Sequence, residues 1–158
     1  MSSLLSHDAF LSVVRDTPLV SIDLIVSDEQ GRVLLGERSN APARGYWFVP
    51  GGRILKDETL QAAFARITTA ELGLKSQMPS AVWQGVYEHF YDDNFAGNSG
   101  ISTHYVVLAY RLVVDAKKLA LPDAQHTRYR WAEPAQIISD ESVHANTRAY
   151  FTGDSMPG

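Results

Sequence analysis

The sequence predicts an α/β domain of the α+β type, in which a mixed β-sheet is sandwiched between α-helices. Strand-like and helix-like segments follow one another without regular alternation, which argues against a doubly wound parallel sheet. The 158 residues contain no repeat or linker, and 45% of them are hydrophobic, enough for one substantial core. We therefore expect a single domain over residues 1–158, with a mobile tail at about 153–158.

The first predicted elements are a short helix and a hairpin. Residues 7–15 fit a helix, and residues 19–27 alternate as a strand with Ile22, Leu24 and Val26 on one face and Asp23 on the other. Turn residues follow at 28–31, so residues 32–38 are expected to return as the second strand.

The middle of the chain is predicted to contain a short strand and a longer helix. Residues 46–49 form an aromatic strand that follows a loop and ends at Pro50-Gly51-Gly52. A helix is expected over residues 57–72, with Asp57 as its cap and Gly73 ending it.

The C-terminal half is predicted to combine strands with two short helices. Residues 82–90 fit a strand, and a long strand over residues 103–115 places alternate apolar side chains, from Val106 to Val114, on one face. A loop over residues 121–127 precedes the last elements. These are a strand at 129–132 and helices at 134–138 and 144–151.

Composition excludes several classes of function. The chain has no cysteine, so disulfides and thiolate metal sites cannot form. Its net charge is −4 and no basic run is present, which argues against a nucleic-acid partner. Apolar runs are too short to span a bilayer, and the N-terminus lacks the features of a signal peptide. We therefore expect a cytoplasmic protein that binds neither nucleic acid nor membrane.

Glu71 is unusual because it extends an apolar helix stripe. Leu60, Phe64, Ile67 and Glu71 stand at i, i+4, i+7 and i+11, close to three full turns. An ionised carboxylate on a buried face is costly unless a cation or hydrogen-bond donors meet it. Two interpretations stay open at this point. Glu71 reaches water at the helix end, or it binds a hard cation such as Mg²⁺.

The surrounding residues form a spaced motif. Gly52, Glu58, Arg66, Glu71 and Gly73 stand as G-x5-E-x7-R-x4-E-x-G, preceded by Trp47-Phe48-Val49-Pro50-Gly51-Gly52. This arrangement resembles the box of the Nudix hydrolases and implies the Nudix fold.

Two positions depart from the Nudix pattern. The usual box has glutamates where this chain has Ile67 and Ala70. Several carboxylates allow typical members to gather several Mg²⁺ ions for attack on phosphorus. Glu71 alone is expected to hold one ion, so the box predicts the fold and argues against the usual chemistry.

One Nudix branch, the GDP-mannose mannosyl hydrolases, has the same depleted box, and this chain is similar to it over roughly residues 7–151. The similar segments are 17–21, 46–53, 89–95, 103–108 and 143–146. The resemblance implies hydrolysis of GDP-mannose, and of GDP-glucose, to GDP and free sugar. Water attacks the anomeric C1 with inversion, and the metal neutralises charge on the leaving diphosphate.

The same resemblance assigns roles to individual residues. The ligands of one Mg²⁺ per active site, or of Mn²⁺ as a substitute, would be the Gly51 carbonyl, the Glu71 carboxylate and the side-chain amide oxygen of Gln125. With one anionic ligand, the ion is expected to bind well only with the diphosphate. His126 matches the general base of the family, a role suited to a histidine near its normal pKa.

Substrate-binding positions follow in the same way. Arg38, Arg53 and Tyr105 match residues that stabilise the departing GDP, since an arginine fork fits phosphate oxygens. Asp23 and His89 match positions near the sugar. For Asp23 a solvent-facing strand position stays an equal alternative, and for His89 a satisfied core histidine does.

Other interpretations are kept open. Arg66 is expected to be structural, pairing with Glu58. The alternative reactions are ordinary Nudix pyrophosphohydrolysis at phosphorus and nucleotide binding without turnover. The resemblance also implies a homodimer.

Overall fold

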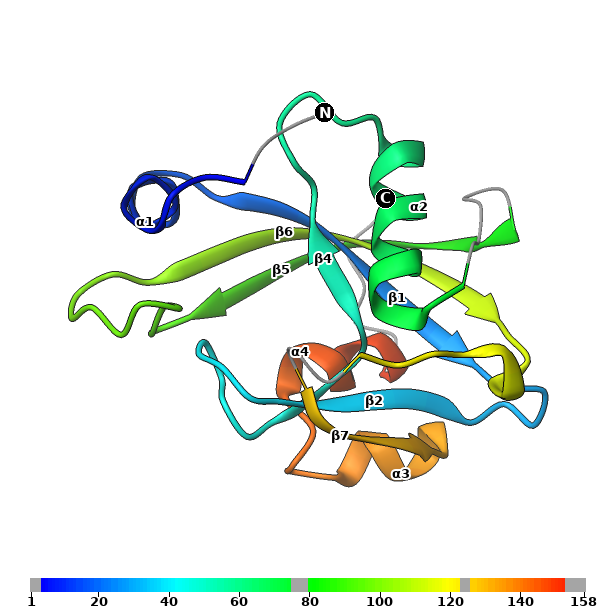
Figure 1. The fold of residues 1–158 in the computed structure, drawn as a ribbon. Helices are drawn as coiled ribbons and strands as arrows, with labels where there is room; N and C mark the ends of the chain where they lie inside the picture. The colour runs from blue at the N-terminus through cyan, green and yellow to red at the C-terminus, as the bar shows by residue number, and fades with distance from the viewer. Residues whose placement is uncertain (1–3, 75–79, 123–125, 153–158) are drawn as a thin grey trace.

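The chain forms one mixed seven-stranded sheet (Figure 1). The computed structural model describes residues 4–74, 80–122 and 126–152, the side chains of residues 126 and 127 excepted. The strands are β1 (Leu19–Ser27), β2 (Val33–Arg38), β3 (Trp47–Phe48), β4 (Gly51–Arg53), β5 (Val82–Tyr91), β6 (Thr103–Val113) and β7 (His126–Ala132). Their order is β3-β2-β1-β6-β5, with β4 paired to β1 and β7 to β2. Only the β1–β6 pair is parallel among these strands.

Helices cover both faces of the sheet, as predicted. They are α1 (His7–Asp16), α2 (Leu60–Leu72), α3 (Pro134–Ser139) and α4 (Ala145–Arg148), with 3-10 turns η2 (Ala116–Lys118) and η3 (Ala149–Phe151). Helix α2 packs on Ile22, Leu24 and Val26 of β1. The opposite face of the sheet packs on α3 and η3 through Ile137 and Tyr150. Within the described residues, no helix has the length and apolar character needed to cross a membrane.

Strands β1 and β2 diverge, and this divergence positions the site. The two strands pair only at Ser27 and Val33. Nearer its start, β1 pairs instead with β4, where Asp23 lies opposite Gly51. The amide of Leu24 also donates to the Pro50 carbonyl at 2.8 Å. The short β4 therefore fills the space between the diverging strands and brings the Pro-Gly-Gly segment beside Asp23.

Helix α2 carries the predicted buried stripe but begins later than expected. Phe64, Ile67 and Glu71 are buried, whereas Leu60 in the first turn is exposed. The cap is Thr59, whose hydroxyl accepts from the Ala62 amide at 3.1 Å. The prediction of Asp57 as cap is wrong, because Asp57 stands two residues earlier with a φ of 67°.

The C-terminal end of α2 agrees with the prediction. Gly73 ends the helix in the left-handed conformation, with a φ of 67°. A Cβ at this position would lie 2.4 Å from the Ala120 carbonyl oxygen, so both conformation and space favour glycine.

Other elements also differ from the predictions, and the predicted helix at 144–151 is divided into α4 and η3. Strand β4 was not predicted as a strand, because its three residues gain their structure from pairing with β1. Strand β7 begins at His126 instead of Tyr129, since it is paired with β2 as far as Arg38. Strand β6 ends at Val113, two residues before the predicted end. The predicted tail at 153–158 lies outside the described residues.

Candidate active site

A pocket of about 380 Å³ opens beside the junction of β1 and β4. Seven residues predicted for the site line it together, although they come from six different helices and strands. These residues are Asp23, Arg38, Gly51, Arg53, Glu71, His89 and Tyr105. The fold thus gathers the sugar, diphosphate and metal positions implied by the sequence around one cavity.

Glu71 lines this pocket, and one of its carboxylate oxygens has no hydrogen-bond partner among the described residues. The residue is 6% exposed, and the unpartnered oxygen is Oε1. Burial raises the pKa of Glu71, while a hydrogen bond from the Gly51 amide and the nearby charge of Arg38 act in the opposite direction. A buried acceptor without a protein partner fits a hard cation, and the place of Glu71 in the pocket wall makes the magnesium role a prediction that the fold is consistent with.

The backbone at Gly51 approaches β1 too closely for any side chain. A Cβ at Gly51 would lie 2.3 Å from Asp23 Oδ1 and 2.6 Å from the Ile22 carbonyl oxygen. Glycine at this position is therefore required by close packing. It also places the Gly51 peptide between the carboxylates of Asp23 and Glu71, at the point where the sequence predicts a metal ligand.

Asp23 is partly buried and lines the pocket. Its Oδ2 accepts a hydrogen bond of 2.5 Å from the hydroxyl of Tyr150. Burial raises the pKa of Asp23 to about 7, against the opposing effects of the Tyr150 hydrogen bond and the charge of Arg38. Asp23 is therefore not a freely exposed strand residue, and its role near the sugar stays a prediction.

His89 also faces the pocket from a buried position. It is 5% exposed, and its Nε2 lies 3.4 Å from the Tyr150 hydroxyl. Burial, with a smaller contribution from His144, lowers the pKa of His89 to about 4. A neutral imidazole at neutral pH can donate from one ring nitrogen and accept at the other.

Cationic and aromatic side chains also line the pocket. Arg38 lies over the ring of Phe48 at 5.8 Å, and Arg53 lies over the ring of Phe10 at 4.5 Å. Tyr105 is half-buried beside them, and burial raises the pKa of its hydroxyl. Arg38 and Arg53 thus place two positive charges around one cavity of a chain whose net charge is −4.

The predicted general base and third metal ligand lie at the edge of the described structure. The backbone of His126 pairs with Arg38, and the β2–β7 register shifts between Glu37 and Arg38. Gln125 and the side chain of His126 lie outside the described residues, so their roles stay predictions.

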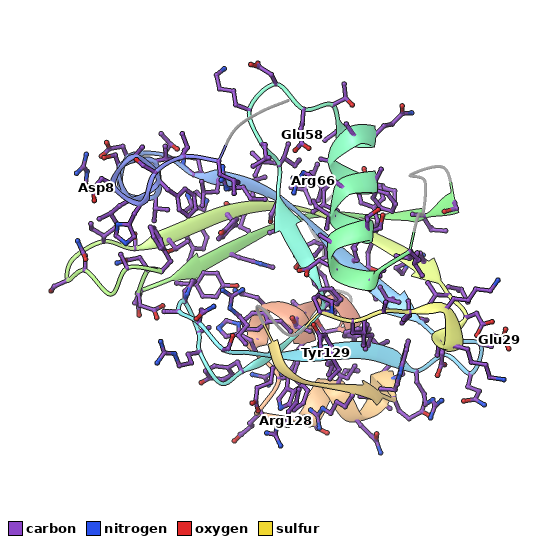
Figure 2. The ribbon with its side chains drawn as sticks, viewed as in Figure 1. Asp8, Glu29, Glu58, Arg66, Arg128 and Tyr129 are labelled. Atoms are coloured by element: carbon purple, nitrogen blue, oxygen red, sulfur yellow. The ribbon has the colours of Figure 1, made fainter. Side chains whose placement is uncertain are left out.

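Arg66 forms the predicted pair with Glu58 (Figure 2). Its Nε and Nη2 atoms donate to the Glu58 carboxylate at 2.7 and 2.9 Å, and Nη2 also donates to the Arg53 carbonyl at 2.8 Å. Glu58 in turn accepts from the Leu55 amide. These bonds fix the loop between β4 and α2, which is a structural role.

Several pocket residues had no predicted role. Phe10, Ser21, Phe48, Tyr91 and Phe95 line the cavity, and Tyr150 lies behind it. Tyr91 and Phe95 belong to the segment 89–95, which is similar to the GDP-mannose mannosyl hydrolases. This similarity was the one indication in the sequence that they could belong to the site. Tyr150 gave no local signal because its partner Asp23 is 127 residues away in the chain.

Comparisons with known proteins agree with this geometry. The NUDIX domain family matches residues 17–152. The low-salt glycan biosynthesis protein Agl8 of Haloferax volcanii is 43% identical over 91% of this chain and 86% of its own length. An RNA pyrophosphohydrolase of Novosphingobium aromaticivorans is 28% identical over 83% of this chain and 85% of its own length.

Solved structures share the fold at lower identity. A MutT protein from Methanosarcina mazei Go1 has a TM-score of 0.68 at 24% identity, covering 86% of this chain and 92% of its own. A MutT NUDIX hydrolase from Burkholderia pseudomallei has a TM-score of 0.68 at 22% identity, covering 89% of this chain and 100% of its own. Since the family match spans most of the chain, the chain belongs to the Nudix family, as a hydrolase of nucleoside diphosphate derivatives.

Proposed function

We propose that this chain hydrolyses GDP-mannose, and also GDP-glucose, to GDP and the free sugar by attack of water at C1 with inversion. The observation that carries the proposal is that α2 contributes a single carboxylate, Glu71, to the pocket. At the two depleted positions of the box, Ile67 is buried in the core and Ala70 is exposed. A site with so few carboxylates is poorly suited to gather the several metal ions that attack on phosphorus requires.

One Mg²⁺ fits beside Glu71 in the pocket, with Mn²⁺ as a substitute. The Gly51 carbonyl, Glu71 and Gln125 are the proposed ligands, and the unpartnered Oε1 of Glu71 supports this choice. When bound, the ion would neutralise negative charge on the diphosphate leaving group. Since Glu71 is the one anion in this set, we expect tight binding only when the diphosphate supplies further oxygens.

Arg38, Arg53 and Tyr105 are proposed to hold the diphosphate. Their positions around one cavity allow two guanidinium groups and a hydroxyl to meet phosphate oxygens together. The Arg66 bond to the Arg53 carbonyl fixes the β4 backbone from which Arg53 projects. Such fixed donors stabilise the charge that builds up as GDP departs.

Asp23 and His89 are proposed to bind hydroxyls of the sugar. Both line the pocket beside the metal position, and both offer acceptor atoms at pH 8, where Asp23 is ionised. Phe10 and Phe95, whose ring centroids lie 4.8 Å apart and which also line the pocket, are proposed to contact the base.

His126 is proposed as the general base that takes the proton from the attacking water. Its backbone position opposite Arg38 supports this role, because Arg38 lines the pocket. We expect His126→Gln to lower kcat by about 10²–10⁴-fold while GDP affinity is retained. Turnover close to wild type in this variant would remove His126 from the mechanism.

Hydrolysis of GDP-mannose in oxygen-18 water tests the reaction itself. Attack at C1 places the label in the free sugar, and attack at phosphorus places it in a phosphate product. Label in the phosphate product would overturn the proposal. Glu71→Gln, which keeps the shape of the side chain, is the matched control for background hydrolysis.

Pyrophosphohydrolysis at phosphorus is the alternative function, and the name of the RNA pyrophosphohydrolase relative favours it. The name of the Haloferax relative favours a substrate used in glycan synthesis, which suits a nucleotide sugar. A release assay with GDP-mannose and with a nucleoside triphosphate separates these two substrates, and it also detects binding without turnover. We further propose a homodimer, to be checked by light scattering.

A further inference from the structure

A buried hydroxyl links two pocket residues from behind. Tyr150 in η3 is 6% exposed and stands outside the set of residues that line the pocket. Its hydroxyl donates to Asp23 Oδ2 at 2.5 Å and lies 3.4 Å from Nε2 of His89. Asp23 and His89 both line the cavity, whereas Tyr150 does not. The Tyr150 hydroxyl therefore contacts two pocket residues without lining the pocket itself.

Tyr150 is itself held in place on the side away from the pocket. Its carbonyl oxygen accepts a hydrogen bond of 2.9 Å from Gln84 Nε2, and the same nitrogen donates to the Tyr87 hydroxyl at 2.9 Å. The Tyr87 ring meets the Tyr150 ring edge-on, with centroids 4.6 Å apart. Contacts with Gln84 and Tyr87 of β5 thus hold Tyr150 in addition to those that its hydroxyl makes with Asp23 and His89.

The direction of the hydrogen bonds follows from the number of protons. The Tyr150 hydroxyl has a single proton, which it donates to Asp23 Oδ2. The same oxygen can then only accept from His89, which requires the proton of the neutral imidazole to be on Nε2. Nδ1 is left as the acceptor of the ring.

We infer that Tyr150 is a positioning residue that orients the Asp23 carboxylate and selects the Nε2–H tautomer of His89. As a result, this part of the pocket presents acceptors, the Asp23 oxygens and His89 Nδ1, to a ligand that donates through neighbouring hydroxyl groups. The identity of that ligand as the sugar of GDP-mannose rests on the proposed function. The tautomer of His89 does not depend on it.

The tautomer is tested on the free protein by nitrogen-15 NMR of the histidine rings at pH 8, with His89→Gln used to assign the signals. We expect the wild type to show His89 protonated at Nε2. Tyr150→Phe removes the hydroxyl alone and is expected to give a mixture of tautomers. An Nδ1–H tautomer in the wild type, or an unchanged Nε2–H signal in Tyr150→Phe, would overturn the inference.

Steady-state kinetics test the consequence for binding. Tyr150→Phe is expected to raise the KM for GDP-mannose about tenfold, in line with the loss of one well-placed hydrogen bond, and to leave the Kd for GDP unchanged. Tyr87→Phe is the matched control, because it removes a neighbouring buried hydroxyl that contacts Gln84 instead of the pocket residues. Its KM should stay near the wild-type value.

An equal weakening of GDP and GDP-mannose binding in Tyr150→Phe would show a general structural defect and contradict the positioning role. An unchanged KM would contradict it as well. Should the wild type fail to hydrolyse GDP-mannose, the proposed function is wrong, while the NMR experiment still decides the role of Tyr150. The two failures are therefore distinguishable.

Discussion

Ile67 of α2 lies directly against Gly52 of β4, so that a Cβ at Gly52 would stand 3.0 Å from Ile67 Cγ1. Ile67 is 1% exposed and belongs to the core cluster beneath the sheet. The position that carries a glutamate in the usual Nudix box is therefore an apolar packing position in this chain. Because Ile67 packs against β4, the helix turn before Glu71 carries an apolar side chain at this position, and Glu71 reaches the pocket without a second carboxylate beside it.

Ile67→Glu is expected to destabilise the protein strongly and to create no new metal site. Burying a carboxylate between α2 and β4 should lower the free energy of unfolding by about 3–5 kcal/mol. Chemical denaturation at pH 7 measures this change, and Ile67→Leu, which keeps the apolar volume, should cost less than about 1.5 kcal/mol. A stable Ile67→Glu protein that binds additional Mg²⁺ would contradict this account of the box.

Glu71→Gln is expected to abolish metal-dependent turnover without weakening the fold. The variant removes the anionic ligand, so kcat should fall about 100-fold or more. Without metal, its free energy of unfolding should equal or exceed that of the wild type, because a buried carboxylate with an unpartnered oxygen is replaced by a neutral amide. Metal titration by calorimetry in the presence of GDP, together with urea denaturation, measures both effects.

Glu58→Gln is the matched control for Glu71→Gln. Glu58 pairs with Arg66 and accepts from the Leu55 amide, so this variant should lose about 1 kcal/mol of stability and keep metal binding. Loss of stability in Glu71→Gln of the size seen in Glu58→Gln would mean that Glu71 is a structural residue.

The spacing of apolar residues along the chain predicted the buried faces of β1 and α2. The alternation in β1 was sufficient to place Ile22 and Leu24 against α2, because successive strand residues point to opposite faces. The apolar spacing of α2 likewise predicted that Phe64 and Ile67 are buried. Both predictions hold since burial follows from periodicity once a sheet and a helix pack together.

Features that depend on distant parts of the chain could not be predicted in this way. Strand β4 is defined by its pairing with β1, and three residues with two glycines carry no strand signal of their own. The N-cap of α2 is Thr59 and not the predicted Asp57, in a loop that is held by the Glu58–Arg66 pair. The Tyr150–Asp23 contact joins the two ends of the chain, and no spacing rule relates them.

Asp140 is expected to stabilise the protein only above about pH 4. Hydrogen bonds from Ser142 and then from Arg130 lower its pKa to about 2. A lowered pKa in the folded state gives stability that is fully present above the unfolded pKa of about 4 and is lost as the pH falls toward 2. Asp140→Asn should therefore cost about 1 kcal/mol at pH 7, since the side chain is partly exposed, and almost nothing near pH 2.

Urea denaturation of Asp140→Asn and the wild type at pH 2, 3, 4 and 7 measures this dependence. Glu141→Gln, which removes a carboxylate at the adjacent exposed residue, is the control variant. A difference between Asp140→Asn and the wild type that is constant over this range would show that the Asp140 carboxylate is not stabilised by its partners.

Asp23 is expected to show the opposite dependence on pH. Burial raises its pKa to about 7, so the folded protein holds the proton more tightly than the unfolded chain. The favourable contribution of protonated Asp23 is then fully present below the unfolded pKa of about 4, and it is lost as the pH rises toward 7. Relative to Asp23→Asn, the wild type should lose up to about 1.4 kcal/mol of stability per pH unit across this window. Urea denaturation of both proteins from pH 4 to 8 measures the difference in their free energies of unfolding, which should level off above pH 7. A difference that does not vary with pH would show that the Asp23 carboxylate is solvated in the folded state.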